Sequence, residues 1–133
     1  MLDLRIIIAA GRRRQTEADQ ALLDERLDDI HEVCRGRNTI LIPTILPDGV
    51  VAMTHRLADK RGCMMEFFPF DYLKHPENGV ELSNQKVIDH GADLLLALPD
   101  VPADGPSHET WDMVRRALGA GIETRIYPEA CHE

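Results

Sequence analysis

Five short apolar segments alternate with four longer segments of helical periodicity, and this alternation constrains the fold more than any other feature of the sequence. The apolar segments are rich in β-branched or aliphatic residues, which is typical of strands buried on both faces of a sheet. A strict alternation of strand and helix predicts a parallel sheet with helices on both faces. We therefore expect an α/β fold: a single Rossmann-like three-layer α/β/α domain with a parallel five-stranded sheet in the order 3-2-1-4-5. The predicted strands span residues 5–10, 39–42, 64–68, 94–98 and 123–127.

The predicted helices span residues 16–35, 50–61, 81–90 and 107–118. Gly36 is the expected C-cap of the first helix, and Ser107 is the expected N-cap of the last. Apolar residues recur at helical spacing in the first helix, and a mixed set lies on one side of the second. These residues are Leu23, Leu27, Ile30 and Cys34 in the first helix, and Val51, His55 and Ala58 in the second.

Length and charge restrict the class of protein. A chain of 133 residues fits one domain, which we place at residues 1–128 with a tail at 129–133. Fifteen basic and 23 acidic residues give a formal net charge of −8, which disfavours nucleic acid and anionic membranes as main partners. The first apolar run precedes its arginines, the reverse of a signal peptide, and the three cysteines form no CxxC pair. We expect a cytoplasmic protein.

The turn after the first predicted strand is the most informative candidate site. Ligands of open parallel sheets bind beyond the carboxyl ends of the strands, and here the residues at that edge are 11–14, 43–49, 69–79 and 99–108. Gly11 lets a ligand approach the backbone, and the helix that follows offers free N–H groups to an anion. Three consecutive arginines, Arg12 to Arg14, suit phosphate. The alternative is that they are solvated charges at a helix start, since neither a G-x-G-x-x-G nor a Walker A motif is present.

Four stretches of the sequence together resemble the YspA-like family of the SLOG (SMF/DprA–LOG) superfamily. The first is Ile-Ile-Ile-Ala-Ala-Gly-Arg at 6–12, and the second is Leu-Ala-Asp-Lys-Arg-Gly at 57–62, which is followed by Glu-Phe-Phe-Pro at 66–69 and Lys-His at 74–75. The third stretch consists of residues 84–89 and 93–99, and the fourth consists of residues 110–117 and 120–122. The resemblance implies a Rossmann-like fold that binds a nucleotide or a nucleotide-derived signal, with no cofactor and with association into a homodimer or higher homo-oligomer.

The resemblance and the predicted edge together select the ligand-binding candidates. They are Gly11, Arg12, Arg13, Thr44, Gly49, Asn84, Asp100 and Thr110. The sequence departs from the family at two turns: Val51 stands where an acid is expected, and Glu109 replaces a glycine. Bulky Ile45 and Leu46 also replace small residues, which favours a second reading in which the chain is a scaffold without a ligand.

An enzymatic reading needs an acid or base at the same edge. In the cytokinin-activating LOG branch, a glutamate follows the Gly-Thr pair and is tied to hydrolysis of a nucleoside monophosphate, but Met113 occupies that position here. A thioether cannot act as a general base, so we expect binding without turnover. The alternative is a LOG-like hydrolase of an N-glycosidic or phosphate bond, with Glu109, His108 or Asp100 as its acid or base.

Other reactive side chains have simpler explanations. The C-terminal Cys131, His132 and Glu133 lack the spacing of a zinc site, and a frayed tail explains them better. Cys34 and Cys63 are expected to act as small core hydrophobes. Trp111 is expected to face either the core or a neighbouring subunit.

Overall fold

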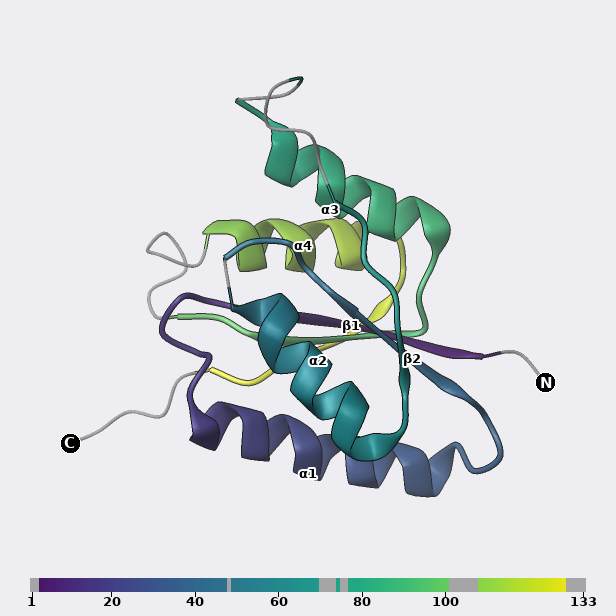
Figure 1. Ribbon diagram of the computed structural model, residues 1–133. Helices are drawn as coiled ribbons and strands as arrows, with labels where there is room; N and C mark the ends of the chain where they lie inside the picture. Colours follow the sequence, from purple (N-terminus) through teal and green to yellow (C-terminus); the bar gives the residue numbers. More distant parts are fainter. Residues whose placement is uncertain (1–2, 48, 70–73, 75–76, 101–107, 129–133) are drawn as a thin grey trace.

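The computed structural model describes residues 3–47, 49–69, 74, 77–100 and 108–128. Strands and helices alternate along the whole described chain (Figure 1). The strands are β1 (Leu4–Ala10), β2 (Thr39–Pro43), β3 (Met64–Met65), β4 (Leu94–Leu98) and β5 (Glu123–Ile126). The helices are α1 (Glu17–Val33), α2 (Val50–Arg61), α3 (Gly79–His90) and α4 (His108–Gly119).

The five strands form one parallel sheet in the order β3-β2-β1-β4-β5, which confirms the predicted fold class and strand order. Strand β1 is central: Ile6 pairs with Leu41 of β2 on one side and with Leu94 of β4 on the other. The chain crosses from one half of the sheet to the other after β3, so strand order reverses between β1 and β4. Ligands bind beyond the carboxyl ends of the strands at such a reversal.

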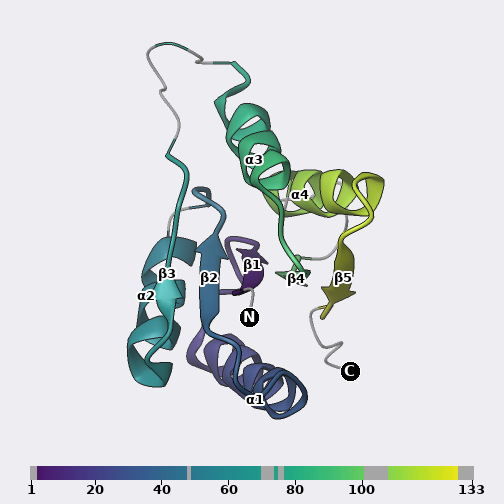
Figure 2. The same cartoon turned by 90° about the vertical axis from the view of Figure 1, so that its right-hand side faces the viewer.

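Helices cover both faces of the sheet, α1 and α2 on one and α3 and α4 on the other (Figure 2). Successive residues of β1 point to opposite faces, so Ile6 and Ile8 pack under α1 and α2 while Ile7 and Ala9 pack under α3 and α4. All four side chains are fully buried. The near-continuous apolar sequence of β1 follows from this burial on both faces.

The edge strand β3 differs from its prediction. Strand β3 has only two residues instead of five, and it pairs only with Ile40 and Leu41 at the sheet edge. Met64 and Phe67 are therefore 63% and 53% exposed, and the expectation of a buried strand here is wrong. Phe68 is buried, but it lies beyond the strand and packs in the cluster on the α3–α4 side.

The first two helices correct two further expectations. Helix α1 ends at Val33 with Cys34 as its C-cap, two residues before Gly36. In α2 the core side carries Val50, Met53 and Leu57, while His55 is exposed. Of the predicted second-helix face, Ala58 is buried in the core, but His55 is not. The apolar pair Val50–Val51 left the register of this face ambiguous. Ser107, the segment 101–107, most of the loop 70–76 and the tail 129–133 lie outside the described residues.

Candidate functional site

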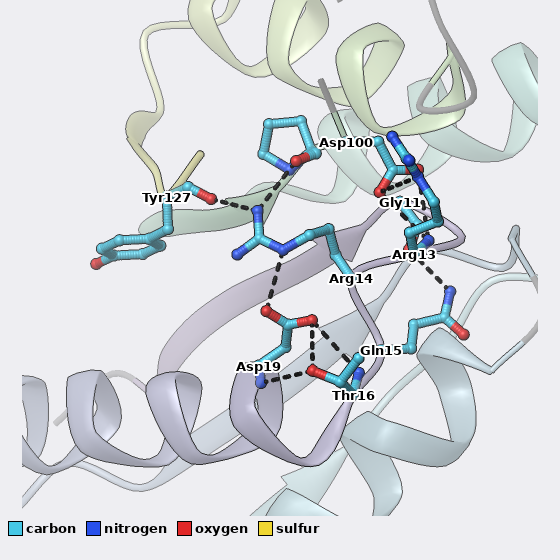
Figure 3. Close-up of polar contacts among 9 residues, drawn as sticks. Gly11, Arg13, Arg14, Gln15, Thr16, Asp19, Asp100 and Tyr127 are labelled. Atoms are coloured by element: carbon cyan, nitrogen blue, oxygen red, sulfur yellow. Dashed lines mark hydrogen bonds and ion pairs between the residues drawn. The ribbon is translucent and has the colours of Figure 1, made fainter. Parts of the chain in front are cut away.

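The turn after β1 leads into α1 and is hydrogen-bonded to the carboxyl end of the neighbouring strand β4. The Gly11 N–H donates to the Leu98 carbonyl at 2.8 Å, and the Arg14 N–H donates to the Gly11 carbonyl at 3.0 Å. The backbone thus folds back on itself over residues 11–14, beside the end of β4 (Figure 3). This turn carries all three consecutive arginines to the edge where the strand order reverses.

The three arginines do not act alike. Arg14 is only 4% exposed and turns into the protein. Its Nε donates to Asp19 at 3.0 Å, and its Nη1 donates to the carbonyl oxygens of Pro99 and Tyr127 at 3.0 and 2.8 Å (Figure 3). The prediction that all three arginines add positive charge at this edge is therefore wrong for Arg14, whose guanidinium instead ties loop backbone together.

Arg12 and Arg13 remain at the surface, with 55% and 58% of their side chains exposed. Each meets a carboxylate from the segment that follows β4. Arg12 donates to Glu109, a residue of the first turn of α4, at 3.0 Å. The Arg13 N–H donates to both carboxylate oxygens of Asp100 at 3.2 and 3.4 Å, and its Nε lies 4.0 Å from one of them. Consecutive residues of one turn thus hold two acids from a distant part of the chain.

The N-terminus of α1 has its own acidic groups. Thr16 caps the helix by accepting from the Asp19 N–H, and the Asp19 carboxylate accepts from the Thr16 N–H in return. Glu17 adds a second acid in the first turn. These carboxylates already interact with the positive end of the helix dipole. An anion at this edge would therefore depend on Arg12 and Arg13 more than on α1.

Two buried hydroxyl groups near this edge have no partner among the described residues. Thr44, 1% exposed, directly follows β2, and its N–H donates to the Ile8 carbonyl at 3.0 Å. Thr110, fully buried, lies in the first turn of α4, next to Glu109. Neither Oγ1 atom makes a hydrogen bond within the described chain. Buried polar groups are usually satisfied, so an unpaired one calls for an explanation.

Gly49 and Gln15 join the turns after β1 and β2. Gly49 is the N-cap of α2 with φ +98°, and a side chain there would collide with Gln15 Oε1. Gln15 in turn donates through Nε2 to the Gly11 carbonyl at 3.2 Å. The missing side chain of Gly49 therefore gives room to a residue that braces the candidate site. Sequence analysis did not single out Gln15, because only the tertiary structure brings the two turns together.

Asn84 is a residue of α3 that faces α4, and it is 2% exposed. Its Nδ2 donates to the Glu109 carbonyl at 3.2 Å and to Asp112 Oδ2 at 2.9 Å. Arg116 donates to the same Asp112 oxygen at 2.8 Å, and this contact raises the pKa of the Arg116 guanidinium. Asn84 thus fixes the backbone of the first turn of α4. Asp112 was missed from the sequence, although its i, i+4 spacing to Arg116 could have signalled an ion pair.

His108, Met113 and Trp111 of α4 make contacts other than those with the arginines. His108 has 65% of its side chain exposed, and its Nε2 lies 3.5 Å from Glu81 of α3. Met113 is fully buried on the core side of α4, so packing accounts for its identity. Trp111 packs against the same cluster, and its Nε1 has no partner in the described chain.

Among the described residues, reactive sulfur and metal-binding groups do not gather at this edge. Cys34 and Cys63 pack against the core on the α1–α2 side, and burial raises the pKa of the Cys63 thiol. No three His, Cys, Asp or Glu side chains of the described residues come together as metal ligands. Cys131, His132 and Glu133 lie outside those residues.

Two cavities that described residues line are at the other edge of the sheet. One of about 390 Å³ lies at the amino ends of the strands, with Arg5, Arg37 and His90 in its wall. Another of about 340 Å³ lies between α1 and β5, with Ile30 and Arg125 in its wall. Both are at the edge of the sheet opposite Arg12 and Arg13. The candidate site is therefore defined by its polar groups, and not by these cavities.

Comparison with known proteins adds no family assignment. Within the described chain, no helix has both the length and the apolar character needed to cross a membrane. No protein-family model matches the sequence, and a search of curated proteins finds no match.

Proposed function

We propose that this protein binds a phosphate-bearing, nucleotide-type ligand at the carboxyl ends of β1, β2 and β4, and that it senses or sequesters the ligand without turning it over. Two observations carry the proposal. One turn at this edge presents the exposed Arg12 and Arg13, and Thr44 after β2 and Thr110 at the start of α4 have buried hydroxyl groups without a partner among the described residues. Guanidinium groups bind phosphate through paired N–H donors, and a ligand could satisfy the hydroxyl groups.

The same proposal covers the context that the sequence suggests. We propose membership of the YspA-like branch of the SLOG superfamily, a cytoplasmic location and self-association into a homo-oligomer. The parallel sheet with its strand reversal between β1 and β4 supports a ligand at this edge. Residues Gly11, Gly49, Asn84 and Asp100 would complete the surroundings of the ligand, with Asn84 acting through the backbone of Glu109.

The test is native mass spectrometry of the purified protein, followed by thermal unfolding with a panel of nucleotides. A ligand at 100 times its dissociation constant adds about 2.7 kcal/mol to the free energy of unfolding. The double variant Arg12→Ala/Arg13→Ala should lose this stabilisation. The matched control is Arg26→Ala/Arg125→Ala, which removes the same charge from other exposed positions. A silent panel, or an equal loss in the control, would contradict the proposal.

A second candidate is hydrolysis of an N-glycosidic or phosphate bond in a nucleotide. The observation that favours it is the pair of carboxylates, Asp100 and Glu109, that consecutive residues of one turn hold at the same edge. Such a pair can supply an acid and a base. Release of free base or of sugar phosphate, abolished by Glu109→Gln, would establish this activity.

A further inference from the structure

We propose that Glu109 is a specificity-determining residue, which restricts the site to ligands whose phosphate carries one negative charge, as in a phosphodiester. The inference rests on the proposed function, because it names the charge class of the ligand at that same site. Its basis is the way in which the positive charge of the turn after β1 is already balanced by carboxylates of the protein.

The charge balance follows from four side chains. Arg12 meets Glu109 at 3.0 Å, and Arg13 lies 4.0 Å from Asp100. Both carboxylates are well shielded from water: 12% of the Glu109 side chain and none of the Asp100 side chain is exposed. The Glu109 carboxylate lies on the guanidinium that would bind the phosphate, so it also lies beside the bound phosphate. It repels a phosphate with two charges about twice as strongly as a phosphate with one charge.

The position of Glu109 is fixed by the packing of α3 and α4. Asn84 donates to the Glu109 carbonyl at 3.2 Å, and Asn84 is itself held by Asp112 at 2.9 Å. Glu109 also lies on the first turn of α4 next to Thr110, whose buried hydroxyl group is unpaired within the described chain. The Glu109 carboxylate itself meets the Arg12 guanidinium at 3.0 Å, on the group that the proposed phosphate would use. The carboxylate therefore lies where it can discriminate between ligands by charge.

Phosphate chemistry makes this discrimination large enough to measure. A phosphomonoester has a second pKa of about 6, so it carries nearly two charges at pH 7.5, whereas a phosphodiester carries one. Like charges brought together in a binding site cost several kcal/mol. We expect the diester to bind at least about tenfold more tightly than the monoester of the same nucleoside.

The experiment measures dissociation constants for matched pairs of nucleotides by calorimetry at pH 7.5 and 0.15 M salt. The probes are the 3′,5′-cyclic monophosphate and the 5′-monophosphate of adenosine, guanosine, cytidine and uridine. The variant Glu109→Gln keeps an acceptor for Arg12 while it removes the charge. It should tighten binding of the monoester at least fivefold and binding of the diester by a smaller factor, about the square root of that change. Glu123→Gln is the control, since it removes one carboxylate at the opposite edge of the sheet.

The outcomes separate this inference from the proposed function. If the native protein prefers the cyclic form of any nucleoside and Glu109→Gln reduces that preference, the inference holds. If the native protein binds the monoester as tightly as the diester, or if Glu123→Gln has the same effect as Glu109→Gln, the inference is wrong and the proposed function stands. If neither the native protein nor Glu109→Gln binds any member of the set, the proposed nucleotide binding itself fails.

Discussion

The Arg14 guanidinium lies 2.8 Å from the Tyr127 carbonyl oxygen, so a residue of the turn after β1 is bonded to the backbone just beyond β5. The two residues are 113 positions apart in the chain. The same guanidinium also binds the Pro99 carbonyl and Asp19. One buried side chain therefore holds together the ends of three strands and the start of α1, and the candidate site lies on that support.

Replacing Arg14 should destabilise the fold strongly. Arg14→Met keeps much of the side-chain volume but leaves Asp19 and two carbonyl groups without their donor. We expect the free energy of unfolding to fall by about 3 kcal/mol, measured by urea denaturation at pH 7.5. Arg125→Met is the control, because its side chain is 45% exposed and its partner Glu123 is 62% exposed, and it should change stability by less than about 0.5 kcal/mol. Equal effects of the two variants would show that Arg14 is not the structural arginine.

Gly49 should not tolerate a side chain. Its φ of +98° is unfavourable for alanine, and a Cβ would collide with Gln15 Oε1. We expect Gly49→Ala to lower the free energy of unfolding by about 1–3 kcal/mol. Adding Gln15→Ala should recover part of this loss by removing the collision, while the backbone strain remains.

The matched control for Gly49 is Gly119, the last residue of α4. A Cβ there has open space and no positive φ. Alanine at this position should leave stability unchanged or raise it by up to about 1 kcal/mol. A neutral Gly49→Ala would mean that the two turns are not braced against each other by Gln15.

A carboxylate at position 84 should break the contact between α3 and α4. Asn84→Asp removes the donor to Asp112 and the Glu109 carbonyl, and it places a second negative charge beside the Asp112 oxygen. We expect a loss of about 2–3 kcal/mol in urea denaturation at pH 7.5. Gln85→Glu makes the same chemical change at the next residue, where the side chain still accepts from Arg116. It should cost less than about 1 kcal/mol.

Acid should weaken the fold through His31. Burial, together with the neighbouring Arg61 guanidinium, lowers the pKa of His31 in the folded protein. His31 Nε2 lies 2.9 Å from Thr39 Oγ1, and Nδ1 lies 2.9 Å from Arg61 Nη2. His31 therefore takes up a proton at higher pH in the unfolded chain than in the folded protein. The contribution of His31 is therefore present above its unfolded pKa of about 6.5 and is lost as pH falls towards its folded pKa.

The measurement is the free energy of unfolding of native protein and His31→Gln at pH 7.5 and 5.5. The native protein should lose more stability on acidification than the variant, which has no titrating group at this position. Hydrogen bonds from Lys60 and Arg61 lower the pKa of Asp24. Asp24 therefore loses its contribution to stability only in more acidic solution. A pH dependence that is identical in both proteins would rule out His31 as its source.

The positions of the strands and helices followed from the sequence where burial is uniform. Strands β1, β2 and β4 are buried on both faces, and their aliphatic runs ended within one residue of the predicted limits. The sheet edge was harder to predict. The run from Met64 to Phe68 has strand composition, but only Met64 and Met65 pair, because an edge position offers one neighbour and leaves part of the segment in solvent.

For the candidate site, the sequence likewise predicted part of the arrangement and left part of it open. Parallel strands with short connections bring residues that follow each strand to one edge, so Arg12, Arg13, Thr44 and Asp100 could be placed there from their order in the chain. Their partners could not. That Arg12 meets Glu109 depends on where the first turn of α4 lies, and that Arg13 meets Asp100 depends on how the turn after β1 folds beside the end of β4. No periodicity in the sequence encodes either placement.

By itself, the sequence determined the layered α/β architecture and its strand order, because the hydrophobic periodicity of each segment fixes which face it buries and the connections follow one hand. Only the tertiary structure decided what each polar side chain does. Three adjacent arginines are equivalent in sequence, yet one is buried as a structural tie and two remain at the surface facing carboxylates. The physical reason is that a charged side chain acts according to its burial and its partners, and both are set by residues distant in the chain.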